Sequence, residues 1–235
     1  MIPSQKLAVQ AQARIRDFSG STVDLTFGFG ALQVTGGGNT VNLVNNNFER
    51  ILGGTVTDFF IFSNGFTLAG GGAGTFIDGG AGVNTLDYSA YTTSVNVNLT
   101  TNAATGVNSG LVGGILNIQN AIGGSAGDIL VGSGQANILV GNNGPDQITG
   151  NAGSDTLDGS AGNDTYFFAG NTWGTDTLTD ISGSDTLNFT AATDNLTFNI
   201  NLATLGVTGG ANSLSVAANN IEDLLGGTGN DSFVF

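Results

Sequence analysis

The sequence predicts an all-β solenoid, in which short strands joined by glycine-rich turns coil one above another. Glycine supplies 40 of the 235 residues, whereas proline supplies only 2. A nine-residue pattern recurs without a gap over residues 123–167. Elsewhere apolar and polar residues alternate, as at Val95, Val97 and Leu99, with the period of a half-buried strand. Repeated turns and strands of this kind indicate a stacked repeat array rather than a collagen-like or disordered chain.

The first twenty residues differ from the rest of the chain. Leu7, Ala11, Ile15 and Phe18 follow helical spacing, and no glycine lies between residues 4 and 18. We expect residues 1–20 to form a short amphipathic helix that caps the first rung, because an open solenoid end exposes strand edges. A frayed N-terminal tail is the alternative.

Residues 21–122 carry weaker copies of the nine-residue pattern. Blocks begin at residues 53, 70 and 79, and their sixth positions hold Asp58, Thr75 and Asn84. The related stretches NFERILGG, NIQNAIGG and NIEDLLGG each lead directly into such a block. We therefore expect solenoid rungs with degenerate repeats over this region.

Residues 123–167 divide into five consecutive blocks of nine residues. Glycine opens each block, and an acid or its amide stands at position six. Side chains alternate along a strand, so position eight should point inward and positions seven and nine outward. Each block thus predicts a six-residue turn and a three-residue strand. Position eight is occupied by Leu130, Leu139, Ile148, Leu157 and Tyr166.

Residues 168–235 are expected to add further rungs and to end in a partial repeat block. Asp176 and Asp185 stand nine residues apart, and Asp231 occupies position six of the block 226–234. The closing DSFVF is similar to an acid-then-apolar export signal. We favour a truncated repeat block as its interpretation.

Composition excludes several classes of function. The net charge is −14, and no basic residue follows Arg50, so binding to nucleic acid is not expected. The chain lacks histidine and cysteine, which argues against zinc, haem and thiol chemistry and against an enzyme. No run of 18 apolar residues is present to span a membrane. Glycine turns with short acids instead offer the carbonyl and carboxylate oxygens that calcium prefers.

The five blocks match the pattern G-G-x-G-x-D-x-U-x, and the chain resembles the haemolysin-type (RTX) calcium-binding repeat family. The resemblance implies a right-handed parallel β-roll, in which successive turns fall on opposite edges and calcium binds between turns two blocks apart. Carried over to this sequence, the metal-binding residues are Asp128, Asp146, Asp164 and Asp185 on one edge, Asn137, Asp155 and Asp176 on the other, and Asp231 in the last block.

Some positions depart from the family pattern. Asn137 replaces the acid, and Ala126 and Gln135 replace the fourth-position glycine. We expect weaker calcium sites there, because neutral oxygens attract the ion less than carboxylates do. Asp155 is therefore expected to matter less than Asp146, which has acids two blocks away on both sides. A metal-free solenoid, whose aspartates only shape turns, is the alternative.

The preferred functional interpretation is a calcium-binding structural segment of a secreted or cell-surface bacterial protein. Such a segment would fold on meeting extracellular calcium and serve as a stalk, a spacer or part of an adhesin. One alternative is a repeat region that supports a separate secreted enzyme domain. Another is a flat solenoid face that binds ice or polysaccharide. Open solenoid ends would also allow end-to-end self-association.

Overall fold

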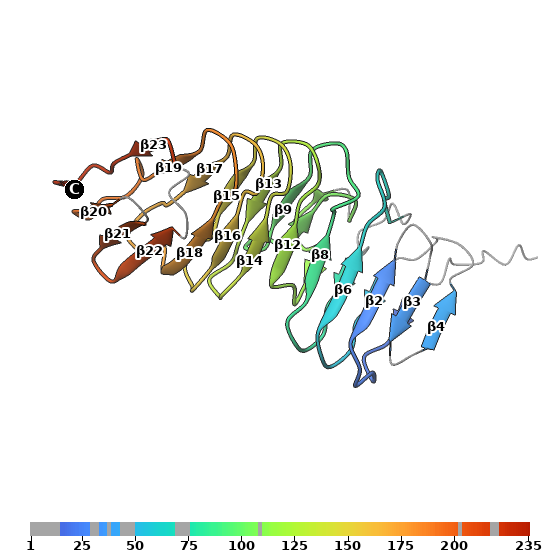
Figure 1. Cartoon of the computed structure of the whole chain (residues 1–235). Helices are drawn as coiled ribbons and strands as arrows, with labels where there is room; N and C mark the ends of the chain where they lie inside the picture. The colour runs from blue at the N-terminus through green and yellow to red at the C-terminus, as the bar shows by residue number, and fades with distance from the viewer. Residues whose placement is uncertain are drawn as a thin grey trace, which may run out of the picture.

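The computed structural model describes residues 15–28, 33–36, 39–42, 50–68, 76–107, 110–201, 204–216 and 221–235. These residues form 24 strands in three sheets and no α-helix. The strands stack along one elongated coil, with β4 toward one end and β20 and β23 toward the other (Figure 1). Within the described residues, no helix reaches the length and hydropathy needed to cross a membrane. The predicted all-β solenoid is thus confirmed.

Two of the sheets form one side of the coil. The four-stranded sheet has the order β1 (Ile15–Asp17), β5 (Arg50–Leu52), β7 (Phe76–Asp78), β11 (Ile115–Leu116). The seven-stranded sheet has the order β10 (Ala103–Ala104), β9 (Asn96–Asn98), β13 (Ile129–Val131), β15 (Gln147–Thr149), β17 (Thr165–Phe167), β19 (Thr186–Asn188), β23 (Asp223–Leu225).

The third sheet runs along the length of the molecule, and antiparallel strands are added near its two ends. Its order is β24 (Ser232–Val234), β20 (Thr197–Ile200), β21 (Leu205–Gly209), β22 (Asn212–Val216), β18 (Thr175–Thr179), β16 (Thr156–Asp158), β14 (Ile138–Val140), β12 (Asn120–Ile122), β8 (Thr85–Asp87), β6 (Asp58–Ile61), β2 (Leu25–Gly28), β3 (Gln33–Gly36), β4 (Asn39–Asn42).

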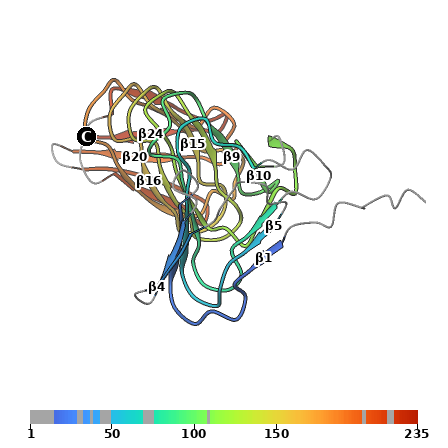
Figure 2. The ribbon, with the colours of Figure 1, turned by 90° about the vertical axis from the view of Figure 1, so that its right-hand side faces the viewer.

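Successive blocks alternate between the two long sheets. Strand β13 pairs in parallel with β15, which places Leu130 opposite Ile148, and β14 pairs with β16, which places Leu139 opposite Leu157. Two blocks therefore make one turn of the coil. Figure 2 shows β16 and β20 on one side of the coil and β9 and β15 on the other.

Position-eight side chains form the predicted core. Leu130, Leu139, Ile148, Leu157 and Tyr166 are fully buried. Their neighbours at position seven face outward, so that an isoleucine there is 39% exposed in β13 and 47% exposed in β14. The predicted strand register is confirmed.

Aromatic residues extend this core toward both ends. Because parallel strands stack in register, side chains at equivalent positions meet face to face. Phe27 stacks on Phe60 at 4.6 Å between ring centroids, and Phe168 stacks on Phe189 at 4.5 Å. Trp173 is buried and meets both rings of the second pair edge-on, so it fills the core.

The predicted N-terminal helix is wrong where the structure describes it. Ile15–Asp17 is the strand β1, which pairs in parallel with β5. Pairing with a strand distant in the sequence outweighs the local apolar spacing that favoured a helix. The first part of the expected helix, residues 1–14, lies outside the described residues, as does Thr75.

Candidate metal sites

The predicted metal-binding residues lie on the two edges of the coil, at the turns that precede the strands. On one edge, the turns lead into β13, β15, β17 and β19. On the other, they lead into β14, β16 and β18. The first edge carries Asp128, Asp146, Asp164 and Asp185, and the second carries Asn137, Asp155 and Asp176.

The spacing between these aspartates lengthens once along the chain. Residues 168–170 are extra, and two further blocks follow them as residues 171–179 and 180–188. Asp155 and Asp176 are therefore 21 residues apart, yet they face each other as closely as Asp146 and Asp164 do. The extra residues leave both edges continuous, so Asp155 does have an acidic partner on its C-terminal side.

One carboxylate oxygen of each aspartate ties its turn to the preceding turn on the same edge. The Oδ1 atom of Asp146 accepts the backbone N–H of Asp128 at 2.7 Å, and that of Asp164 accepts the N–H of Asp146 at 2.8 Å. The same bond joins Asn137 to Asp155, Asp155 to Asp176 and Asp164 to Asp185, at 2.8 to 2.9 Å. These bonds hold every carboxylate in one orientation.

The second carboxylate oxygen divides the turns into two kinds. In what we call open turns, the Oδ2 atom is buried and has no hydrogen-bond partner. In closed turns, the oxygen accepts the backbone N–H of position two in its own block, for example that of Gly124 on Asp128 at 2.6 Å. The open turns are those of Asp146, Asp155, Asp164, Asp176 and Asp185. The closed turns are those of Asp58, Asp128, Asn137 and Asp231.

Position four distinguishes the two kinds of turn. Every open turn has a glycine there with positive φ, such as 110° at Gly144 and 142° at Gly153. Closed turns have other backbone conformations there, and Val56, Ala126 and Gln135 occupy three of them. Because only glycine adopts these angles without strain, the residue at position four helps to set the turn type.

Position two also helps to set the conformation of the first three open turns, because its residue is left-handed there. Asn142, Asn151 and Ser160 have φ of 75°, 67° and 70°. The amides of Asn142 and Asn151 donate to the position-one carbonyls of Gly123 and Gly132, two blocks earlier, at 2.8 and 2.9 Å. Side-chain hydrogen bonds of this kind stabilise a left-handed residue in a turn. The position-two N–H is then not available to the aspartate of its own block.

Burial makes the open-turn carboxylates costly to ionise. Burial, with a smaller contribution from the nearby carboxylates of Asp164 and Asp128, raises the pKa of Asp146 to about 7. Burial likewise raises the pKa of Asp155 to about 6 and that of Asp176 to about 7. No basic residue follows Arg50 in the sequence, so the blocks contain no cationic side chain that could compensate these charges.

The residues present fit a calcium ion. Calcium prefers hard oxygen ligands, including carboxylates and backbone carbonyls, and open turns supply buried carboxylate oxygens beside glycine backbone. In the first three open turns position one is glycine, and a Cβ atom on Gly141 or Gly150 would collide with the Oδ2 atom of Asp146 or Asp155. Orphaned oxygens in so confined a space call for a cation or a proton.

In turns with asparagine at position six, the side-chain amide makes hydrogen bonds within the chain, so no ion is needed there. The Asn84 amide nitrogen donates to the carbonyl oxygens of Asn117 at 2.8 Å and Ala81 at 3.4 Å. The amide nitrogen of Asn137 donates to the carbonyl oxygen of Gln119 at 2.6 Å. An amide N–H₂ thus binds carbonyls that a carboxylate cannot bind.

The sequence prediction missed two acidic residues on the first edge. Asp180 lies beside Asp164 and Asp185, and Glu222 accepts the backbone N–H of Asp185 through Oε2 at 2.8 Å. Reading residues 171–188 as two regular blocks would have placed Asp180 at position one of the second block. Glu222 belongs to no block, so the repeat gave no signal for it.

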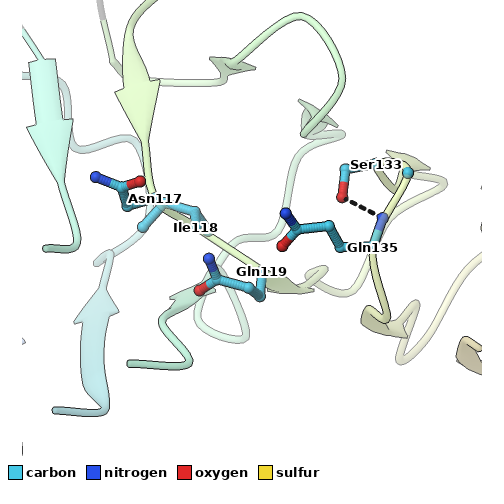
Figure 3. Close-up of a pocket in the computed structure, with 6 residues that line it drawn as sticks. Asn117, Ile118, Gln119, Ser133 and Gln135 are labelled. Carbon is cyan, nitrogen blue, oxygen red and sulfur yellow. Dashed lines mark hydrogen bonds between the residues drawn. The ribbon is translucent and has the colours of Figure 1, made fainter. Parts of the chain in front are cut away.

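A polar pocket of about 460 Å³ lies beside the closed turn of Asn137 (Figure 3). It is lined by side-chain amides and hydroxyls, and Ser133 Oγ accepts the backbone N–H of Gln135 at 3.2 Å. No acidic residue lines the pocket, so it offers a cation no charge. Its lining residues are Asn117, Ile118, Gln119, Ser133, Gly134 and Gln135.

Comparison with known proteins agrees with this geometry. The family described as the RTX calcium-binding nonapeptide repeat matches residues 122–144 and 131–166, in four copies. No curated protein matches the chain. The matched residues include the closed turns of Asp128 and Asn137 and the first three open turns. Residues 122–166 therefore carry RTX calcium-binding nonapeptide repeats, a type of repeat that binds calcium ions.

Proposed function

We propose that this chain is a structural segment of a secreted or cell-surface bacterial protein that completes its folding when it binds calcium outside the cell. The observation that carries the proposal is the row of five buried Oδ2 atoms without partners. Leaving such groups ionised and unpaired opposes folding, and calcium would remove that opposition.

Three pairs of open turns would hold the ions. They are formed by Asp146 with Asp164, Asp164 with Asp185, and Asp155 with Asp176, because each pair is already joined across its edge by a backbone-to-carboxylate hydrogen bond. The closed turns of Asp128 and Asp231 would contribute less, since both of their carboxylate oxygens already accept backbone N–H groups.

The role we propose is mechanical rather than catalytic. The sequence lacks histidine and cysteine, and the buried aspartates are spaced regularly along two edges instead of gathering in one cleft. A stack of hydrogen-bonded rungs with a continuous core suits a stalk or spacer. Extracellular calcium modules bind with dissociation constants of about 10⁻⁴ to 10⁻³ M, which would keep the segment unloaded inside a cell and loaded outside. End-to-end stacking of copies belongs to the same proposal.

Circular dichroism of the calcium-depleted chain, titrated with calcium, tests the proposal. We expect the strand signal and the melting temperature to rise with calcium. Magnesium should act weakly, because it requires tighter octahedral geometry and loses water reluctantly. Light scattering in the same titration reports self-association. A strand signal that stays the same from excess chelator to saturating calcium would contradict the proposal.

A further inference from the structure

Asp180 occupies a place that the tandem repeats reserve for glycine. It is position one of the block 180–188, in which Asp185 is position six. In the tandem blocks, a Cβ atom at position one would collide with the acid of the same block, as at Gly141 and Gly159. A carboxylate at this position therefore stands beside the oxygen that open turns leave without a partner.

Three carboxylates converge as a result. Asp164, Asp180 and Asp185 each place one carboxylate oxygen within 4.8 Å of the other two. The residues are 1, 2 and 0% exposed, and the Oδ2 atoms of Asp164 and Asp185 are buried without hydrogen-bond partners. The carboxyl groups of Asp180 and Asp185 can hydrogen-bond to each other only if one of them carries a proton. The cluster thus requires either protons or a cation.

Tyr166 holds Asp180 in place. Its hydroxyl accepts the backbone N–H of Gly159 at 2.6 Å and donates to Asp180 Oδ2 at 2.6 Å. The other tandem blocks have leucine or isoleucine at this position, which cannot make these bonds. Two departures from the repeat pattern therefore meet in one hydrogen-bonded unit, which orients the third carboxylate toward the pair on the edge.

We propose that Asp164, Asp180 and Asp185 together bind one divalent cation, and that this is the first calcium site of the chain to fill. The proposal rests on calcium binding by the open turns and adds a ligand that the nonapeptide pattern lacks. Calcium fits the site by its preference for carboxylate oxygens, and affinity rises with the number of charged ligands. The pairs Asp146–Asp164 and Asp155–Asp176 offer two carboxylates each, so they fill later.

Calcium titration calorimetry of the full chain with Asp180→Asn tests this assignment. We expect the tightest binding step to weaken about tenfold or more while the later steps stay within twofold, as expected for the loss of one charged ligand. Asp223→Asn is the matched control, because it removes the same charge from an exposed residue of β23. It should leave every step unchanged.

A double variant guards against misfolding. Tyr166→Leu with Asp180→Gly restores the residue types of the regular blocks at both positions. It should still gain strand signal with calcium, but without the tightest step. A tightest step that is unchanged in both variants, or all steps weakened equally, would overturn the three-carboxylate site while leaving calcium-dependent folding intact. Absence of calcium binding in the unmodified chain would instead refute the proposed function.

Discussion

The turns of Asp128 and Asp146 are neighbours on one edge of the coil, yet they treat their carboxylates in opposite ways. Asp128 accepts backbone N–H groups on both oxygens, whereas Asp146 leaves Oδ2 buried and without a partner. The acid is the same, and the backbone differs: Gly144 has a φ of 110°, and Ala126 stands at the equivalent position. Readiness for a metal therefore depends on the glycine at position four as well as on the acid at position six.

Rungs with closed turns and rungs with open turns also differ in whether they need an ion in order to fold. Closed turns complete their hydrogen bonds within the chain, so they form without an ion. Open turns confine partly ionised carboxylates that repel one another, so they form well only with a counterion. Most of the closed turns precede residue 141, and the open turns lie together at residues 141–185.

The largest expected effect is that of removing calcium. We expect the rungs of residues 141–188 to lose most of their amide hydrogen-exchange protection in excess chelator, because all five orphaned oxygens lie there. The rungs of β6, β8 and β12 should keep more of theirs. Exchange measured by mass spectrometry with and without calcium checks this. An equal loss of exchange protection in both regions would show that the rungs with closed turns do not fold independently of the rungs with open turns.

A change of pH should act next most strongly, since it reaches several open-turn carboxyls at once. The pKa values of Asp146 and Asp176 are about 7 when folded, well above the usual aspartate value of 3.8. The folded, calcium-free chain thus binds more protons than the unfolded chain between about pH 4 and pH 7, so its stability falls as pH rises through that window. Melting of the calcium-free chain at pH 5.5 and pH 8 should give the higher temperature at pH 5.5.

With saturating calcium, the melting temperature should no longer be higher at pH 5.5 than at pH 8, because protons and calcium compete for the same oxygens. A calcium-free chain that melts at the same temperature at both pH values would contradict the assignment of buried, partly protonated carboxyls.

A substitution at position four should separate the two turn types. Gly144→Ala places a side chain at a φ of 110°, where its Cβ atom would lie 2.5 Å from the backbone carbon of Ala126. We expect a loss of about 1–3 kcal/mol in the free energy of unfolding in calcium. Gly134→Ala is the control, because it adds the same methyl group at position three of a closed turn, where nothing lies within 4 Å of the added Cβ. Denaturant unfolding of both should leave the control within about 0.5 kcal/mol of the unmodified chain.

The smallest effect should come from single carboxylates. Asp155→Asn in an open turn should raise the calcium midpoint of folding about tenfold, which corresponds to about 1.4 kcal/mol. Asp128→Asn in a closed turn should change it less than about twofold, because Asn137 already accepts the N–H of Ser133 in the same way. Calcium titrations followed by circular dichroism compare them. Equal shifts would mean that closed turns also bind the ion.

Much of the fold was predictable because the repeat encodes it locally. The position of each residue in the repeat places Leu139 inside and Ile138 outside, and the structure confirms both. The N-terminal helix was predicted wrongly for Ile15–Asp17, because strand pairing with distant residues is not encoded in local spacing.

The candidate site was predictable only in part. Position six identified the aspartates, but the difference between open and closed turns depends on backbone angles and on which N–H groups are already used. Asp146 and Asp155 were expected to differ, yet both face a partner on the C-terminal side through equivalent hydrogen bonds. Asp180 escaped notice because three extra residues displace its block from the regular spacing.

Those extra residues have a consequence for how repeats of this kind are counted. The family match stops at residue 166, just before them, whereas hydrogen bonds between turns continue to Asp176 on one edge and Asp185 on the other. The insertion lies between blocks, so it lengthens the spacing between successive aspartates once on each edge and by the same three residues. The turns on both edges therefore stay aligned with their neighbours. The ion capacity of such a chain is therefore better measured by following its two edges in space than by tallying uninterrupted nonapeptides in its sequence.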